Sequence, residues 1–469
     1  MLISQQELVL QGYYMRVLPP PGQIFGHPKG LFLLFGTEMW ERFSYYGMRA
    51  LLVLTLVAAV DDVNPGFGMS KSSALHLYGW FTGIMWFSTI LGGWVADNLI
   101  GQRRAVQIGA LVLAAGQFTL SAAVPGNLPL FYTGLVVLVL GNGLFKANIS
   151  TMVGALYEQG DARRDGAFTI FYMGINIGSF IAPLICSTLG ESTAFGWRYG
   201  YMAAGIAMLL AFLLQTFLGR AMLGEVGVQP SAKLALASTG GVKKPLTKEE
   251  FDRLRVMLTV FIFCVLFWGA YEQQGGLMNL YAQEKIERMF GAHFEIPAGW
   301  FQSVNPFFIV TLGPVFAALW ERLGAKRKNP PSPVKMIFGL ALTGFGFLLM
   351  LGATYEQAGG GKANMAWLIL ALMFHTMGEL CISPVGLSMT TKLAPLRLAS
   401  LIMGVWFLTN FGGNIMAGYV GALAENQGDA AVFGGLAGSL FVFAALLWAV
   451  SGKLVRWMHG AEDVAAEVP

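Results

Sequence analysis

Apolar stretches of about 20 residues recur along this chain from end to end, and each is long enough to cross a lipid bilayer as a helix. The sequence has 469 residues, of which 55% are hydrophobic and 12% are charged. A soluble protein of ordinary composition carries about 25% charged residues. The chain is therefore predicted to be an integral membrane protein, with the lipid bilayer as its surroundings.

Twelve membrane spans can be placed along the chain. They cover residues 30–57, 74–97, 104–123, 129–150, 165–189, 199–219, 255–283, 299–321, 334–353, 364–390, 397–423 and 433–456. The stretch after the sixth span contains Gly, Ser, Pro and a polar run, and it divides the spans six and six. We therefore predict an all-α fold with two six-helix bundles, at 1–219 and 255–469, joined by a cytoplasmic linker at 220–254. Transporters built from repeated halves have this arrangement.

Basic residues predict the orientation of the spans. Most of the 30 Lys and Arg fall at the termini and in the even-numbered loops, and an excess of basic residues marks the cytoplasmic side of a membrane protein. Both termini are therefore expected in the cytoplasm, with the protein in the plasma (inner) membrane. The segment before the first span has consecutive prolines and no continuous apolar run, so no cleaved signal peptide is predicted. The net charge of +4 then reflects topology, and no nucleic-acid partner is expected.

The first span carries charges that a lipid-facing helix would exclude. Glu38, Glu41, Arg42 and Arg49 lie within one apolar run. At roughly 100° per residue, these four residues and Tyr45 fall within about 60° either side of one line along the helix. Charges at this depth are tolerated where they face a polar interior and act there. We interpret this face as one that handles protons and anions.

Three further ionisable residues lie well within other spans. Lys146 is followed by polar residues, although a lysine near the cytoplasmic end of a span can also extend its ammonium to the membrane surface. Glu272 precedes a Gln-Gln-Gly-Gly run, which suggests a locally loosened helix that lines a cavity. Glu379 and Ser383 are one helical turn apart and share a face. A purely structural ion pair is the alternative for either glutamate.

The tryptophans and cysteines within the spans are weaker candidates for a functional site. Trp86 and Trp406 lie mid-span and fit either a pocket wall or the lipid interface, where tryptophans are common in membrane proteins. Cys186, Cys264 and Cys381 are scattered over apolar spans without metal-ligand spacing, so we assign them to packing. No phosphate loop, Gly-x-Ser-x-Gly turn or metal motif occurs in the sequence. Neither enzymatic activity nor a cofactor is predicted.

The loop after the second span carries a Gly-Asp-Gly-Arg-Arg pattern at Gly93, Asp97, Gly101, Arg103 and Arg104. Glycines let helix ends approach closely, and Asp97 can accept hydrogen bonds from a neighbouring helix end or from a loop arginine. The pattern resembles the loop motif of the major facilitator superfamily. Its place between the second and third spans favours this resemblance over a generic basic loop.

Four segments together resemble the proton-dependent oligopeptide transporter family. The segment at 38–47 contains Glu-x-x-Glu-Arg, and the segment at 168–179 lies on the fifth span. The other two are 141–148, which includes Lys146, and 300–306, which leads into the eighth span. The resemblance implies the fold of the major facilitator superfamily. It also implies a proton-coupled symporter that imports di- and tripeptides by alternating access, acting as a monomer.

The resemblance further implies roles for individual residues. The substrate carboxylate would bind Arg49 and Lys146, and the substrate ammonium would bind Glu379. The residues linked to the proton would be Glu38, Glu41, Arg42 and Glu272. The other residues that line the pocket would be Tyr45, Tyr46, Trp86, Asn176, Trp268, Asn305, Ser383 and Trp406. Two ion pairs would close the pathway, Arg49–Glu272 on the extracellular side and Lys146–Glu379 on the cytoplasmic side.

Three departures from the family pattern bear on these expectations. Trp86 stands where a tyrosine is common on the second helix, which puts that hydrogen bond to the substrate in question. The linker has no apolar run for the two extra helices found in many bacterial relatives. The second-helix histidine of animal members is absent, with Gly79 near its place, so proton coupling is assigned to carboxylates.

The nearest alternative function is proton symport of another small anion, such as nitrate, or of a glycoside by a member of the same family. Glu379 favours a substrate with an amine, because a bare anion needs no carboxylate in its site. Drug export is a further alternative, which competition by dipeptides would test. A receptor would usually add a soluble signalling domain, and the longest soluble stretch of this chain is the short central linker.

Overall fold

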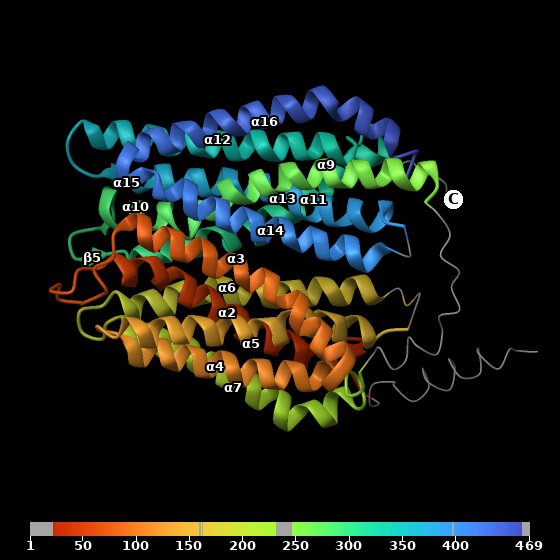
Figure 1. Ribbon diagram of the computed structural model, residues 1–469, viewed down its shortest axis with the longest axis horizontal. Coiled ribbons are helices and arrows are strands. Elements are labelled where there is room, and N and C mark those ends of the chain that lie inside the picture. Colours follow the sequence, from red (N-terminus) through yellow and green to blue (C-terminus); the bar gives the residue numbers. More distant parts are fainter. Residues whose placement is uncertain (1–21, 159–160, 162, 231–245, 396–397, 462–469) are drawn as a thin grey trace, which may run out of the picture. The chain divides into compact units, whose positions relative to one another are not determined.

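The computed structural model describes residues 22–158, 161, 163–230, 246–395 and 398–461. In this part of the chain a long helix lies at each of the twelve predicted spans, which confirms the predicted all-α fold (Figure 1). The long helices are α2 Lys29–Val57, α3 Lys71–Val95, α4 Gln102–Ala123, α5 Leu128–Ala155, α6 Arg163–Gly190, α7 Trp197–Leu223, α9 Lys248–Tyr271, α11 Val304–Ala325, α12 Ser332–Ala358, α13 Met365–Leu393, α14 Ala399–Ala422 and α16 Asp429–Trp457. The segment 1–21, where no signal peptide is predicted, and residues 231–245 of the predicted linker lie outside the described residues.

Short elements connect or interrupt the long helices. The helical ones are the π turn η1 Ala96–Ile100, the 3₁₀ turn η2 Glu272–Gln274, α10 Leu277–Lys285, the 3₁₀ segment η3 Ala298–Ser303 and α15 Ala424–Gln427. The strands pair as β1 Gln23–Ile24 with β2 His27–Pro28, β3 Ile286–Glu287 with β6 Ala363–Asn364, and β4 Met289–Phe290 with β5 Phe294–Glu295. The pair β3–β6 is parallel, and the other two are antiparallel.

Ten helical segments of the described chain are long and apolar enough to cross a membrane, judged by length and composition. α2 is not among them, because Glu38, Glu41, Arg42 and Arg49 interrupt its apolar run. Its 29 residues are nevertheless sufficient, since a membrane-spanning helix needs about 20. All four charged side chains are buried inside the protein. The charges of α2 therefore do not face lipid.

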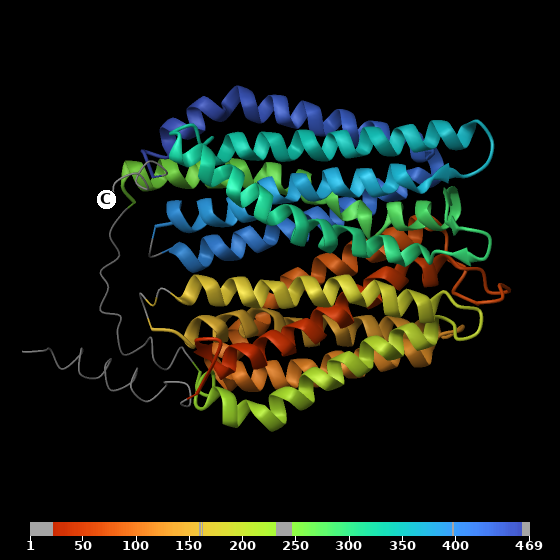
Figure 2. The same ribbon diagram turned by 180° about the vertical axis from the view of Figure 1, so that it is seen from behind.

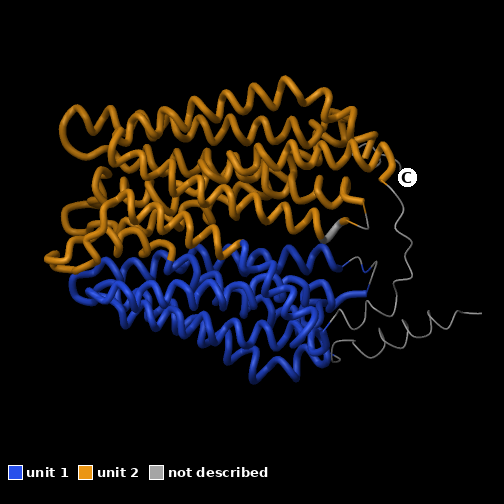
Figure 3. Tube along the Cα trace, viewed as in Figure 1, with its two compact units in different colours: residues 1–48, 87–241 blue, residues 49–86, 242–469 orange. Residues whose placement is uncertain are grey.

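The helices form two compact units (Figure 3). Unit 1 comprises residues 1–48 and 87–241, and unit 2 comprises residues 49–86 and 242–469. Residues 49–86 precede the predicted linker, yet they group with the C-terminal helices. α2 and α3 therefore each contribute residues to both units.

Polar contacts account for the place of residues 49–86 in unit 2. The Asn279 Nδ2 group donates a hydrogen bond to the Ala50 carbonyl at 2.9 Å. At the start of α3, the backbone N–H of Ser72 donates to Glu425 Oε2 at 2.5 Å. The first N–H groups of a helix have no partner within the helix, so Glu425 accepts a hydrogen bond from an N–H group that has no acceptor within α3. These contacts attach the end of α2 and the beginning of α3 to C-terminal elements.

Within each unit, long helices pack directly against one another. In unit 1, α4 packs against α5 and α7. In unit 2, α12 packs against α13 and α16, and α12 and α16 run side by side in both views (Figures 1 and 2). Small residues at such contacts let membrane helices approach closely.

The loop motif between α3 and α4 attaches the start of α4 to the segment that follows α7. Gly101 has φ +83°, and a Cβ there would lie 2.3 Å from the Val228 carbonyl oxygen, so only glycine fits. The Arg103 Nη1 group donates to the Gly224 carbonyl at 2.9 Å, and the Arg103 backbone N–H donates to the Gly227 carbonyl at 2.8 Å. The remaining motif residues are Gly93 on α3, Asp97 in η1 and Arg104 on α4.

Candidate functional site

Unit 1 contains a cluster of four charged side chains, of which three are buried and Lys146 is partly exposed. α2 presents Glu38, Glu41 and Arg42 within one turn, and α5 contributes Lys146. Arg42 binds Glu41 through two hydrogen bonds, from Nε to Oε2 and from Nη2 to Oε1, each 2.5 Å long. Lys146 Nζ donates to Glu38 Oε1 at 2.7 Å, and Arg42 Nε lies 3.4 Å from the same oxygen. Two acids and two bases thus balance each other.

Burial makes this pairing necessary. The side chains of Glu38 and Glu41 are 0% and 2% exposed, and an isolated charge at such a position would be strongly destabilising. Both oxygens of Glu41 accept hydrogen bonds from Arg42, whereas Glu38 Oε2 is buried and has no hydrogen-bond partner among the described residues. A proton placed on Glu41 would weaken the bidentate pair and release Arg42.

Within unit 1, Lys146 forms an ion pair with Glu38. The pair between Lys146 and Glu379 that the resemblance implies stays a prediction. Glu38 lies 108 positions earlier in the chain. Helical periodicity shows which residues share a face of one helix, but it does not show which helix packs against that face. The carboxylate of Glu379, in unit 2, is bound by other residues.

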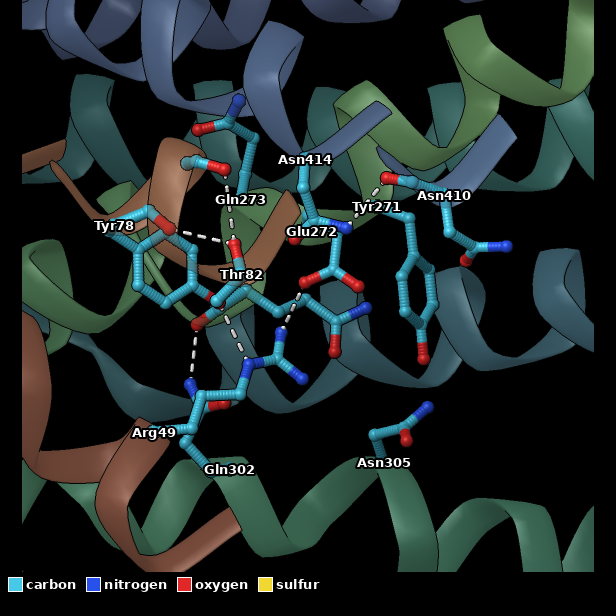
Figure 4. A network of polar contacts seen from close by, with 12 residues as sticks. Arg49, Tyr78, Thr82, Tyr271, Glu272, Gln273, Gln302, Asn305, Asn410 and Asn414 are labelled. Atoms are coloured by element: carbon cyan, nitrogen blue, oxygen red, sulfur yellow. Dashed lines mark hydrogen bonds and ion pairs between the residues drawn. The ribbon is translucent and has the colours of Figure 1, made fainter. Parts of the chain in front are cut away.

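In unit 2 the structure brings Arg49 and Glu272 together. The Arg49 Nη2 group donates to Glu272 Oε2 at 2.8 Å, and the Arg49 Nε group donates to Tyr78 Oη at 2.8 Å (Figure 4). All three side chains are buried. Tyr78 is not among the residues predicted from the sequence, although it lies one helical turn from Thr82, a second polar residue in an apolar helix. Tyr78 and Glu272 together orient the guanidinium of Arg49.

Gly275 provides the space for this contact. A Cβ at Gly275 would lie 2.0 Å from Tyr78 Oη and 2.4 Å from Arg49 Nε. Atoms in a close-packed interior do not approach so closely, so any side chain at this position would displace both groups.

Gly275→Ala should destabilise the protein by about 1–3 kcal/mol, the usual effect of overpacking a buried site. Gly438→Ala is the matched control, because Gly438 lies on α16 where an added Cβ meets no atom within 4 Å. Thermal unfolding of both purified variants in detergent measures the difference. Equal melting temperatures for the two variants would contradict the steric argument.

The helix that carries Glu272 is broken at this point. α9 ends at Tyr271, η2 follows as a 3₁₀ turn, and α10 begins after two glycines. Gln273 Nε2 donates to the Ala417 carbonyl at 3.0 Å, and Gln302 Nε2 donates to the Gln274 carbonyl. A broken helix inside a membrane protein needs such partners for its freed backbone groups. The Gln-Gln-Gly-Gly run thus forms the break and helps to stabilise it.

Glu379 on α13 is held by donors from two other helices. Tyr271 Oη donates to Glu379 Oε2 at 2.5 Å, and Asn305 Nδ2 donates to the same oxygen at 3.0 Å. Asn305, at the start of α11, also donates to Thr376 Oγ1 at 3.0 Å. Ser383 lies one turn further along α13 and is partly exposed. Tyr271 is not among the residues predicted from the sequence, although it directly precedes the predicted site residue Glu272.

The remaining proposed pocket residues of unit 1 lie on α2 and α6. The rings of Tyr45 and Tyr46 meet edge to face with centroids 5.2 Å apart. The guanidinium of Arg42 lies over the Tyr45 ring, 5.2 Å from its centroid, within the range of a cation–π contact. Asn176 is buried and donates to the Tyr172 carbonyl within α6 at 2.9 Å. The aromatic residues thus adjoin the charged cluster of unit 1.

The three tryptophans proposed to line the pocket lie in unit 2, each against another aromatic ring. Trp268 meets Tyr271 edge to face at 5.3 Å, and the partly exposed Trp86 stacks on Phe407 at 6.1 Å. Trp268 and Trp406 are 7% and 4% exposed. Their burial decides against the lipid-interface alternative for Trp406.

The cysteines and metal-ligating side chains form no site of their own. Cys186, Cys264 and Cys381 are free and buried. Among the described residues, no three His, Cys, Asp or Glu side chains are grouped so that they could hold a metal ion.

The chain is similar to known proteins over most of its length. The sequence model described as the POT family matches residues 103–233 and 228–434. The chain is 37% identical over 456 residues to the peptide transporter YePEPT of Yersinia enterocolitica, covering 85% of this chain and 88% of the relative. It is 35% identical over 440 residues to a di-/tripeptide transporter of Lactococcus lactis, covering 82% and 87%.

A solved structure matches over almost the full length as well. The crystal structure of the peptide transporter POT in complex with sulfate superposes with a TM-score of 0.86 at 33% identity, covering 97% of this chain and 100% of that chain. The match extends the resemblance from sequence motifs to the complete fold of the major facilitator superfamily. The chain belongs to the POT family, the proton-dependent oligopeptide transporters that its sequence resembles.

Proposed function

We propose that this protein is a proton-coupled symporter that imports di- and tripeptides by alternating access. Membership of the POT family makes it a membrane transporter and not an enzyme. Relatives named as peptide and di-/tripeptide transporters support the substrate class. The observation that carries the proposal is that unit 2 holds both Arg49 and Glu379, a guanidinium for the carboxylate of a peptide and a carboxylate for its ammonium.

Arg49 links the substrate to the proton. Its Nη2 and Nε groups are bound by Glu272 and Tyr78, so the carboxylate of a peptide competes with Glu272 for the same guanidinium. Protonation removes the charge of Glu272 and favours the peptide in this competition. Lys146 would add a second positive charge for the substrate once it leaves Glu38.

The cluster of unit 1 supplies the second proton-dependent step. A proton on Glu41 or Glu38 frees Arg42, because the four charges of the cluster balance only when both glutamates are ionised. Breaking and remaking these pairs would accompany the conformational cycle of an alternating-access transporter. The ion pair between Lys146 and Glu379 stays part of the proposal, as a cytoplasmic closing contact formed at another stage of the cycle.

The proposal also includes the setting in which the protein works. The distribution of Lys and Arg over the loops supports a plasma (inner) membrane protein with both termini in the cytoplasm. The functional unit is a monomer, and its partners are a peptide, protons and the lipid bilayer, without a nucleic acid.

Uptake into liposomes tests the proposed function. We expect vesicles with an alkaline interior to accumulate labelled dialanine, because the pH gradient drives protons and peptide inward together. One pH unit corresponds to about 1.4 kcal/mol per proton, which supports up to about tenfold accumulation at one proton per peptide. Unlabelled di- and tripeptides should compete with dialanine.

Nitrate, a glycoside and N-acetylated dialanine are the informative competitors. They should inhibit far less than free dialanine, since none offers both a carboxylate and an ammonium. An ionophore that collapses the pH gradient should return uptake to the level of simple equilibration. Strong inhibition by nitrate, or dialanine uptake that does not depend on the pH gradient, would refute the proposed function.

A further inference from the structure

We propose that Tyr271 is a positioning residue. Its hydroxyl fixes the orientation of the Glu379 carboxylate, and its place beside Glu272 connects that carboxylate to the Arg49 ion pair. The inference deepens the proposed function and rests on it, because it concerns how the proposed ammonium-binding acid is held.

The hydrogen bonds to Glu379 are asymmetric. Tyr271 Oη and Asn305 Nδ2 both donate to Oε2, at 2.5 Å and 3.0 Å. Within the described part of the chain, Oε1 accepts no hydrogen bond. Hydrogen bonds to an ionised group are stronger than neutral ones, so two of them on one oxygen fix the plane of the carboxylate. Oε1 then keeps a defined direction and remains available to an ammonium group.

The Tyr271 ring is itself held in place on the last turn of α9. It stacks on Phe267 with centroids 5.5 Å apart and an interplanar angle of 29°. It also meets Trp268 edge to face at 5.3 Å, and the residue is 6% exposed. Because aromatic neighbours restrain the ring, the hydroxyl position depends on the backbone at the end of α9.

That backbone position is where the helix breaks. Tyr271 is the last residue of α9, and Glu272 is the first residue of the 3₁₀ turn η2. From this break the Glu272 carboxylate meets Arg49, while the Tyr271 ring extends toward Asn305 (Figure 4). A short 3₁₀ stretch within a helical span often marks a hinge, because its hydrogen bonds are weaker than those of an α-helix.

The two proposed binding groups for the substrate, Arg49 and Glu379, are thereby connected through the peptide bond between Tyr271 and Glu272. When a peptide carboxylate replaces Glu272 on Arg49, the restraint on η2 is released. Rotation at the break then moves the Tyr271 hydroxyl relative to Glu379, which changes how firmly Glu379 is oriented. Capture of the carboxylate at Arg49 and capture of the ammonium at Glu379 become interdependent.

Tyr271→Phe keeps the ring and removes the hydroxyl. In the liposome assay, the KM for dialanine should rise about tenfold, the factor expected for losing a hydrogen bond to a charged group. Vmax should stay close to the wild-type value. Selectivity for dialanine over N-acetylated dialanine should fall by a similar factor, because acetylation removes the ammonium that Glu379 binds.

Tyr281→Phe is the matched control for this variant. Tyr281 is also a buried tyrosine, on α10, and its hydroxyl has no hydrogen-bond partner within the described chain. Its KM and selectivity should equal those of the wild type. Wild-type selectivity in Tyr271→Phe, or the same loss in both variants, would overturn the inference.

A double variant tests the connection between Tyr271 and Glu272. In Tyr271→Phe combined with Glu272→Gln, the loss of selectivity should be smaller than the product of the two single losses, since both changes act on the same hinge. If the loss of selectivity in the double variant equals the product of the two single losses, the connection between Tyr271 and Glu272 is refuted. A wild-type protein that does not accumulate dialanine refutes the proposed function as a whole. A transporting wild type with an unaffected Tyr271→Phe variant refutes the role of Tyr271 alone.

Discussion

Gradient-driven uptake of dialanine should be abolished by Glu41→Gln, while exchange of peptide at equal pH on both sides continues. Both carboxylate oxygens of Glu41 bind Arg42, so in the proposed mechanism a proton on Glu41 would release Arg42. Glutamine has nearly the same shape but binds and releases no proton in this pH range. Position 41 then keeps one charge state, and we expect that a pH gradient can no longer drive the cycle through it.

Two assays on the same vesicles separate these effects. Accumulation under a pH gradient should fall to the level of gradient-free vesicles, and counterflow of labelled dialanine should persist. Glu158→Gln is the matched control, the same chemical change at an exposed residue beyond α5, and it should transport like the wild type. Accumulation that survives in Glu41→Gln would assign the coupling proton to another carboxylate.

Arg49→Ala should cause the largest combined loss, of both stability and uptake. Removing one partner of a buried ion pair leaves the other charge uncompensated, which typically destabilises a protein by about 3–5 kcal/mol. Glu272 is 8% exposed and would be that charge. The substrate carboxylate would also lose its guanidinium, so uptake should fall by about a hundredfold or more.

Arg49→Ala combined with Glu272→Gln separates the two losses. Neutralising Glu272 removes the unpaired charge, so the thermal unfolding temperature in detergent should return toward the wild-type value. Uptake should stay low, because the guanidinium is still missing. Recovery of uptake in the double variant would limit Arg49 to a structural role. If Arg49→Ala unfolds at the wild-type temperature, the ion pair between Arg49 and Glu272 does not contribute to stability.

The sequence predicts the helices well because apolar length is a local property. The predicted span at 165–189 corresponds to α6, Arg163–Gly190, within two residues at each end. The predicted span at 255–283 is instead divided among α9, η2 and α10. The grouping of Glu38, Glu41 and Arg42 on one face follows in the same way from the period of an α-helix. Such features need no knowledge of which helices become neighbours.

The choice of partners could not be predicted in this way. Lys146 pairs with Glu38, and Tyr271 pairs with Glu379, in each case across 108 positions of the chain. A periodic pattern shows that a face is polar, but the partner of each side chain depends on how distant helices pack. The same holds for residues 49–86, whose contacts with Glu425 and Asn279 place them in unit 2.

One unbroken helix carries both kinds of proposed function. α2 runs from Lys29 to Val57 and contributes Arg42 to unit 1 and Arg49 to unit 2. Arg42 and Arg49 are seven positions apart, which corresponds to about 10 Å along the axis of an α-helix. With the proposed roles, a residue linked to the proton and the residue that binds the peptide carboxylate belong to the same helix. A movement of α2 that accompanies a change in protonation would therefore also move Arg49, without an intervening loop.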